Sequence, residues 1–144
     1  MIEKILHTEP GLLIFMIRII AGIVLFPHGF QKLLGWFGGD GFSGTIKHMA
    51  HLGIPKPIAA LVIVGQSFGS VALIIGFLGR IVAFFVLIIM AGAMMPNTKN
   101  GWLMNWNGKK KGEGMEYFLL YLTLVFILLV NGSGSFSLDI FLFK

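Results

Sequence analysis

The feature that most constrains this chain is an apolar run from Leu12 to Lys32, LLIFMIRIIAGIVLFPHGFQK, with one arginine inside it. About 20 helical residues at about 1.5 Å per residue cross the roughly 30 Å hydrocarbon core of a bilayer, so the run predicts a transmembrane helix. An ionisable side chain at that depth costs at least about 2.5–3.5 kcal/mol and is normally paired or lines a cavity. We therefore expect Arg18 to point into a bundle of helices, held by polar groups such as Gln66 and by helix-end carbonyls.

The composition also indicates a membrane protein. The chain has 144 residues, of which 56% are hydrophobic and 12% are charged. A soluble domain usually carries about 25% charged residues, so this composition predicts one membrane domain over residues 1–144. The net charge of +5 comes mostly from basic residues between the apolar runs. Membrane proteins use such residues to set their orientation, so the expected partner is a lipid bilayer and not nucleic acid.

Three further apolar runs follow the first, and together the four runs predict an all-α, polytopic membrane four-helix bundle. The expected helices cover residues 12–32, 58–78, 81–95 and 115–130. Gly65 and Gly69 of the second helix have the small-x-x-x-small spacing that lets helix backbones approach closely. Short interfacial helices are expected in the first loop, over residues 43–52, and at the termini, over residues 1–10 and after Ser137.

The distribution of basic residues predicts the orientation. Four crossings place both termini on one side of the membrane. Apart from Arg18, that side carries three basic residues, Lys4, Arg80 and Lys144, whereas the other side carries seven lysines. The positive-inside rule then predicts a multi-pass protein of the cell (inner) membrane, with both termini outside and the lysine-rich loops cytoplasmic.

The chain has no cysteine. This excludes a thiolate nucleophile, a disulfide relay, an iron–sulfur cluster with cysteine ligands and C-x-x-C-H haem attachment. His48 and His51 lie one helical turn apart, but no third ligand is evident nearby, so no metal site is predicted. We therefore expect no covalently bound cofactor. Any redox work would need electrons from a bound small molecule or from a partner.

Most polar residues of the expected bundle lie towards its lysine-rich end, with Gln66 part-way down and Arg18 deeper, and packing of the helices could bring them around one cavity. The candidates for ligand binding are Arg18, Gln31, Lys32, Gln66 and Asn97, and the candidates for acid–base catalysis are His28 and Glu116. Glu116 could pair with Lys32 or His28, since lipid would leave these charges without partners. Two interpretations stay open at this point: the residues form a ligand or redox site, or they only fix the register of the helices.

Several motifs carry a family resemblance that runs through nearly the whole chain. They are Arg18-x-x-x-Gly22, His28-Gly29-x-x-Lys32-Leu33-x-Gly35, Leu52-Gly53-Ile54-Pro55, the Gly-rich second helix up to Gly76, Asn100-Gly101-Trp102, Gly114-x-Glu116-Tyr117 and Gly132-x-Gly134-x-x-Ser137-Leu138-Asp139. In this order they resemble the DoxX family of small integral membrane proteins. Two positions depart from the family pattern: Gln66 stands where many members have glutamate, and Asn97 where many have histidine. These departures weaken any proton-transfer role carried over from the family.

The resemblance implies a four-helix inner-membrane protein with a redox function. The wider DoxX/DoxD group includes the membrane subunit of a thiosulfate:quinone oxidoreductase. By analogy, this chain would be a membrane subunit of a quinone-linked oxidoreductase related to sulfur compounds or to redox stress. Its cofactor would be a quinone, and His28 and Glu116 would relay the two protons that quinone reduction takes up. A shared fold does not fix a function, so this stays an expectation.

Two alternatives stand beside the redox function. The chain could transport a small solute or a lipid, with Arg18 holding an anionic group. It could also be a membrane scaffold without catalysis that anchors partners through Lys109–Lys111. The sequence leaves open whether the chain is itself an enzyme, and whether its protein partner is a soluble or membrane redox protein or a second copy of the chain.

Overall fold

The computed structural model describes residue 7 and residues 10–143, and over these residues it is helical with no β-strand. Within this part of the chain, three segments are long and apolar enough to cross a membrane: Leu12–Leu34, Lys56–Ile75 and Gly79–Asn100. A fourth apolar helix, Met115–Asn131, is shorter. The prediction of an all-α membrane bundle is therefore confirmed.

The helices follow the order expected from the apolar runs. They are α2 (Leu12–Leu34), α3 (Gly41–His51), α4 (Lys56–Ile75), α5 (Gly79–Asn97), α6 (Met115–Asn131) and α7 (Leu138–Leu142). α4 ends at Ile75, earlier than expected, because Gly76 adopts a left-handed φ of 72° that terminates the helix. The interfacial helix expected over residues 1–10 falls almost entirely outside the described residues.

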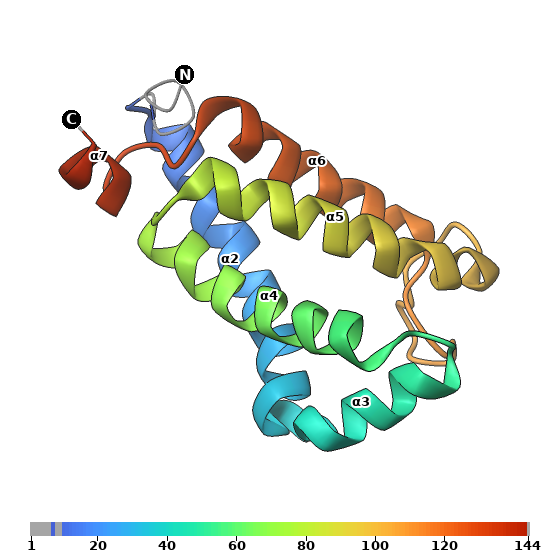
Figure 1. Ribbon diagram of the computed structural model, residues 1–144. Helices are drawn as coiled ribbons and strands as arrows, with labels where there is room; N and C mark the ends of the chain where they lie inside the picture. The colour runs from blue at the N-terminus through green and yellow to red at the C-terminus, as the bar shows by residue number, and fades with distance from the viewer. Residues whose placement is uncertain (1–6, 8–9, 144) are drawn as a thin grey trace.

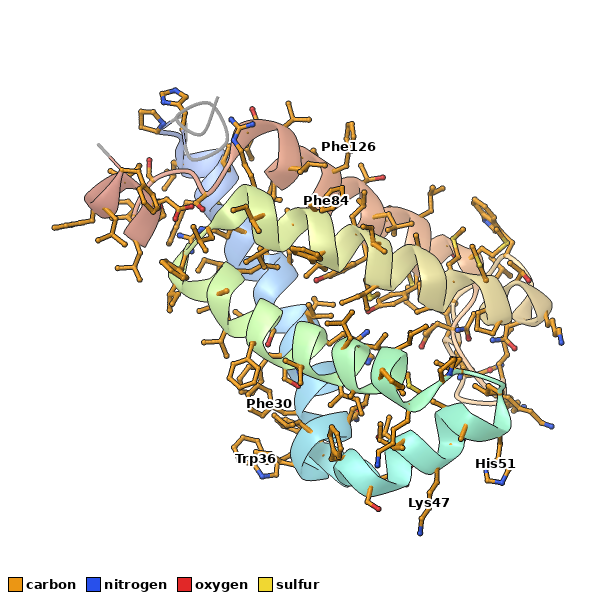
Figure 2. The ribbon with its side chains drawn as sticks, in the orientation of Figure 1. Phe30, Trp36, Lys47, His51, Phe84 and Phe126 are labelled. Carbon is orange, nitrogen blue, oxygen red and sulfur yellow. The ribbon has the colours of Figure 1, made fainter. Side chains whose placement is uncertain are left out.

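The bundle has two different ends (Figure 1). The start of α2, α7 and the turn between α4 and α5 lie at one end, called the terminal end below. The opposite end, called the loop end, carries α3 and the segment 98–114 that joins α5 to α6. Lys47 and His51 stand on the face of α3 that is turned away from the bundle (Figure 2).

Two glycines of α2 allow this helix to pack closely against α4. A Cβ atom on Gly29 would lie 2.6 Å from the Cα atom of Ser67, and one on Gly22 would lie 2.7 Å from Cγ1 of Ile74. At both positions α2 therefore lies directly against α4, which only glycine allows. The expected close approach at Gly65 and Gly69 is made to side chains of α5, where a Cβ atom on Gly69 would lie 3.1 Å from Val86 Cγ2.

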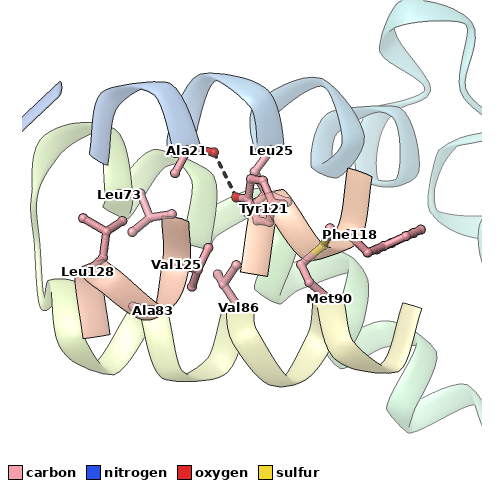
Figure 3. Close-up of a cluster of buried hydrophobic side chains, with 10 residues drawn as sticks. All are labelled: Ala21, Leu25, Leu73, Ala83, Val86, Met90, Phe118, Tyr121, Val125 and Leu128. Atoms are coloured by element: carbon pink, nitrogen blue, oxygen red, sulfur yellow. Dashed lines mark hydrogen bonds between the residues drawn. The ribbon is translucent and has the colours of Figure 1, made fainter. Parts of the chain in front are cut away.

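One cluster of buried side chains between the helices is apolar apart from a single hydroxyl (Figure 3). Its fully buried cluster consists of Ala21, Leu25, Leu73, Ala83, Val86, Met90, Phe118, Tyr121, Val125 and Leu128. The Tyr121 hydroxyl donates a 2.9 Å hydrogen bond to the Ala21 carbonyl, which ties α6 to α2. Large apolar side chains such as Phe84 and Phe126 project outward from α5 and α6 (Figure 2), as expected of surfaces in contact with lipid.

Candidate functional site: a polar cavity at the loop end

A cavity of about 200 Å³ lies between α2, α4, α5 and α6 towards the loop end. Its lining residues are His28, Lys32, Gln66, Met90, Ala93, Asn97, Glu113, Tyr117 and Phe118. Four of the residues singled out from the sequence, His28, Lys32, Gln66 and Asn97, are thus brought together. His28 is exposed, so the cavity reaches the surface of the bundle.

The packing of α2 against α4 positions the first polar pair of the cavity. Gly29 lies against the backbone of Gln66 and Ser67, and Lys32 follows on the next turn of α2. The Lys32 ammonium group consequently donates a hydrogen bond to the side-chain oxygen of Gln66. The Gln66 amide group faces the sulfur of Met90 at 3.6 Å. Among the described residues, the Lys32 ammonium group has no carboxylate partner and no hydrogen bond besides that to Gln66, so its other N–H groups stay available to a ligand.

The second polar pair joins α2 to α6. The Tyr117 hydroxyl lies 3.4 Å from Nε2 of His28, and the two rings are 6.1 Å apart between centroids. The tautomer of His28 decides which group donates, and at this distance the bond is weak. Pro27, which has no N–H group, removes one helical hydrogen bond directly before His28. Because the bond between them is weak, the Tyr117 hydroxyl and the His28 imidazole can each take another partner at little cost.

Glu113 brings a carboxylate to the cavity from the connecting segment. One of its oxygens accepts a 2.9 Å hydrogen bond from the Asn105 backbone N–H, while the other has no hydrogen-bond partner in the described part of the chain. Glycines flank Glu113 because the backbone passes very close to its neighbours. A Cβ atom on Gly112 would lie 2.5 Å from Asn97 Oδ1, and one on Gly114 would overlap the Leu103 carbonyl. The Gly-Glu-Gly sequence thus permits the close passage that places Glu113.

Three of the residues predicted from the sequence, Gln31, Glu116 and Arg18, lie outside the cavity lining. The Gln31 amide donates to the Phe37 carbonyl at 3.2 Å and so faces the turn after α2. The Glu116 carboxylate accepts from the Met104 backbone N–H at 3.2 Å. The expected ion pair of Glu116 with Lys32 or His28 is not found among the described residues. Glu116 lies in the first turn of α6, and one oxygen of its carboxylate is bound to the connecting segment.

Arg18 forms a separate polar centre towards the terminal end. Its side chain is fully buried, as expected, and its N–H groups bind only backbone carbonyls. Nε donates to Ser133, Nη1 to Leu73 and Ile74, and Nη2 to Ser135 and Phe136, at 2.5–3.4 Å. The expected contact with Gln66 was wrong, since Gln66 lies in the cavity, whereas the expected helix-end carbonyls were correct. Five donors meet five carbonyls, so no N–H group of Arg18 is left for a ligand.

Asp139 completes this centre from the other side of the same segment. Its carboxylate accepts hydrogen bonds from the Leu78 and Gly79 backbone N–H groups, at 2.6 and 2.8 Å, and from the Ser133 hydroxyl at 2.5 Å. These bonds cap the start of α5, whereas Arg18 caps the end of α4. Arg18, Ser133 and Asp139, with the backbone groups that they hold, are called the clasp below. In the sequence, Asp139 is conspicuous only as the last residue of the motif Gly132-x-Gly134-x-x-Ser137-Leu138-Asp139.

Reasoning from the sequence missed five cavity residues: the apolar Ala93 and Phe118, and also Met90, Glu113 and Tyr117. Tyr117 stands beside the predicted Glu116 in the motif Gly114-x-Glu116-Tyr117, and that motif was the available indication. Glu113 lies just before α6, where helical periodicity gives no direction for a side chain. Met90 looked like an ordinary packing residue among several methionines.

Comparison with known proteins finds one matching family profile and two similar proteins. The DoxX family profile matches residues 13–105. A protein of Bacillus subtilis (strain 168) named "Putative oxidoreductase CatD" is 29% identical over 129 residues, which cover 90% of this chain and 86% of that protein. "Inner membrane protein YphA" of Escherichia coli (strain K12) is 29% identical over 133 residues, which cover 88% of each chain. No solved structure matches the chain. The profile match and the apolar helices together show that this chain is a membrane protein of the DoxX family.

Proposed function

We propose that this protein is the membrane subunit of a quinone-linked oxidoreductase, and that a quinone binds in the polar cavity at the loop end. The observation that carries the proposal is the content of the cavity. It combines an ammonium group, an amide, an imidazole, a phenol and a carboxylate with apolar walls. Binding sites for small molecules have this character, with apolar walls and a few polar groups that orient the ligand.

The size and the walls of the cavity suit one substituted ring. A cavity of about 150 Å³ holds a benzene molecule, and this cavity measures about 200 Å³. Met90, Ala93 and Phe118 supply apolar surface for the faces of a ring. The long isoprenoid tail of a natural quinone would stay in the bilayer, which surrounds the bundle.

The two polar pairs suit a ring with two carbonyl oxygens. The Lys32–Gln66 pair and the His28–Tyr117 pair each have N–H or O–H groups that can donate to an oxygen. A bound quinone supplies the redox chemistry, since it takes up two electrons and two protons. A reduced redox partner would provide the electrons, and reduced sulfur compounds or redox-stress substrates are the expected source.

Proton supply would fall to the titratable residues of the cavity. A histidine gains or loses a proton near neutral pH, so His28 can pass protons towards a ligand. Glu113 belongs to the segment 98–114 and lines the cavity, and we assign it the carboxylate role that was predicted for Glu116. Gln66 and Asn97 do not titrate, so they are left with orienting roles.

The relatives support this proposal only in outline. The name of CatD includes the word oxidoreductase, and YphA is named as an inner membrane protein. We propose the same membrane for this chain, with the lysine-rich loop end in the cytoplasm. The transport alternative relied on Arg18 to hold a solute, but all five N–H groups of Arg18 are occupied by carbonyls. The scaffold alternative gives no reason for a cavity with this lining.

A binding experiment tests the proposal. Protein purified in mild detergent is analysed for co-extracted quinone and then titrated with decylubiquinone and menadione. The His28→Ala and Lys32→Met variants should bind at least about tenfold more weakly, because each loses a hydrogen bond to the ligand. Gln31→Ala is the matched control, since Gln31 lies one residue before Lys32 and outside the cavity. Equal binding by all four proteins, or binding by none, would overturn the proposal.

A pair of carboxylate variants tests the redox step. Glu113→Gln and Glu116→Gln remove the same charge three residues apart, but only Glu113 lines the cavity. In membranes that contain the natural partner, Glu113→Gln should slow quinone reduction and Glu116→Gln should not. A slower reaction only in Glu116→Gln would return the role to the residue predicted from the sequence.

A further inference from the structure

The segment 98–114 presents an aromatic and basic surface at the loop end. Trp102, Leu103 and Trp106 are 58%, 59% and 78% exposed. Lys109 and Lys111 are exposed as well. The segment contains four lysines and a single acidic residue, Glu113, which lines the cavity. The surface formed by Trp102, Leu103, Trp106, Lys109 and Lys111 is called the basic face below, and no acidic residue belongs to it.

Hydrogen bonds hold this segment in a defined shape. The Asn105 side chain accepts from the Lys110 N–H and donates to the Lys110 carbonyl, both at 3.0 Å. The Lys110 ammonium group donates to the Leu103 carbonyl at 2.7 Å. Lys110 is thus bound within the segment, and its neighbours Lys109 and Lys111 are left for an external partner.

The same segment is anchored on α6 and reaches the cavity. The first N–H groups of α6, those of Met115 and Glu116, donate to the carbonyls of Gly101 and Trp102 at 3.0 Å. Asn105, which holds Lys110 with its side chain, also donates its backbone N–H to the Glu113 carboxylate. The basic face and the cavity carboxylate therefore share one hydrogen-bonded unit.

We infer that the basic face binds anionic phospholipid headgroups, and that this contact sets the position of Glu113 in the cavity. Exposed tryptophans at a helix end lie at headgroup depth, where lysines meet lipid phosphates. Each lysine near an anionic surface strengthens binding by about fivefold. The chemistry selects phosphatidylglycerol or another anionic lipid over zwitterionic lipid. The effect on the cavity rests on the proposed quinone site, whereas the lipid contact does not.

Quenching by brominated lipid tests the lipid contact directly. In a Trp36→Phe background, the remaining tryptophans are Trp102 and Trp106, both in the basic face. Bilayers contain equal parts of phosphatidylglycerol and phosphatidylcholine, with either one brominated. Brominated phosphatidylglycerol should quench more strongly, with an apparent preference of roughly fivefold or more that declines at high salt. Equal quenching by the two lipids would overturn the inference.

A matched pair of charge variants tests which lysines act. Lys109→Ser/Lys111→Ser and Lys47→Ser/Lys56→Ser remove two positive charges each from exposed residues of the loop end. The first variant should lose most of the preference for brominated phosphatidylglycerol, and the second should keep it. An equal loss in both variants would show a general charge effect and would overturn a specific basic face.

The effect on the cavity is measured by decylubiquinone affinity in nanodiscs with and without phosphatidylglycerol. Affinity should rise at least about threefold with the anionic lipid, and Lys109→Ser/Lys111→Ser should abolish the rise. A lipid preference without any change in affinity would overturn the coupling to Glu113. No binding in any lipid would instead overturn the proposed quinone site and leave the lipid contact standing.

Discussion

The two polar centres of this bundle draw on the same helix but differ in how completely their groups are bound. In the clasp, Arg18 donates to five carbonyls and the Asp139 carboxylate accepts from three donors. In the cavity, the Lys32 ammonium group has one hydrogen bond, and the Tyr117 hydroxyl lies 3.4 Å from Nε2 of His28. A complete set of bonds stabilises a fold, whereas an incomplete set beside a cavity leaves groups for a ligand.

The glycine packing of α2 explains why one helix serves both centres. Gly22 lies against Ile74 and Ser70, one turn from Arg18, and Gly29 lies against Ser67, one turn from Lys32. Each glycine brings the neighbouring cation of α2 up to α4. The two centres differ in what lies next to each cation: the segment after α6 closes over Arg18, whereas the cavity lies beside Lys32.

Loss of Arg18 should have the largest effect on folding. Arg18→Met leaves five buried or partly buried carbonyls without their donor, and removing one partner of a buried polar network costs about 3–5 kcal/mol. Thermal unfolding in detergent should show a large loss of stability or no folded protein. Arg18→Lys should also destabilise the bundle, because an ammonium group has three donors and lacks the planar fork.

Arg80→Met is the control for this prediction. Arg80 also lies at the terminal end, but it is only half-buried and binds two carbonyls, those of His7 and Leu129. Its loss should cost well under half of what the loss of Arg18 costs. Equal costs would mean that the clasp does not dominate the stability of this end.

The next largest effect is expected from a change in the packing of α2 against α4, on which both polar centres depend. Gly29→Ala places a Cβ atom 2.6 Å from the Ser67 backbone, and overpacking of this kind typically costs about 1–3 kcal/mol. The variant should lose stability and also quinone affinity, because it moves Lys32 away from Gln66. Gly92→Ala is the control, since nothing lies within 4 Å of its added Cβ atom and alanine favours a helix. A tolerated Gly29→Ala would contradict the direct contact of α2 with α4.

The sequence predicted the fold and about half of the site for identifiable reasons. Long apolar runs with polar breaks give the helices, because lipid requires each backbone group to be satisfied within its own helix. Residues near the same end of neighbouring helices lie at a similar depth in the membrane. This similarity was enough to predict that His28, Lys32, Gln66 and Asn97 lie close together. Depth alone does not tell which neighbour a side chain meets. For this reason Arg18 was wrongly paired with Gln66.

The parts that were not predicted depend on segments outside the long helices. The carboxylate of the cavity is Glu113, because a loop between two glycines passes close to Asn97 and Leu103. The partners of Arg18 come largely from the segment 133–136, more than 110 positions away in the chain. Loops have no periodicity from which a side-chain direction could be derived. Their contacts follow only from the assembled bundle.

A double variant in the cavity sharpens the comparison between the two centres. Lys32→Met/Gln66→Leu replaces both partners of a polar pair with apolar residues of similar size. Such a replacement is often nearly neutral or even stabilising. We expect the unfolding free energy to stay within about 1 kcal/mol of the wild type, while decylubiquinone affinity falls at least about tenfold. A loss of stability as large as that of Arg18→Met would assign this pair a structural role.

The smallest predicted effect separates two tyrosines of α6 that lie one turn apart. The Tyr117 hydroxyl faces His28 at 3.4 Å in the cavity, whereas the buried Tyr121 hydroxyl donates to the Ala21 carbonyl at 2.9 Å. Tyr117→Phe should leave stability within about 0.5 kcal/mol, because it removes only a weak hydrogen bond. It should lower decylubiquinone affinity by roughly threefold to tenfold, the equivalent of one neutral hydrogen bond to the ligand.

Tyr121→Phe should give the opposite result. Its loss leaves the bond between α6 and α2 unmade, so stability should fall by about 0.5–1.5 kcal/mol with unchanged affinity. Unfolding and decylubiquinone titration measured on both variants show which tyrosine has a structural role and which binds the ligand. If Tyr117→Phe lowers stability and spares binding, the His28–Tyr117 pair belongs with the clasp as a structural contact. The cavity would then have a single ligand-binding pair, Lys32 and Gln66, and a ring with two carbonyl oxygens would no longer be the ligand that fits it best.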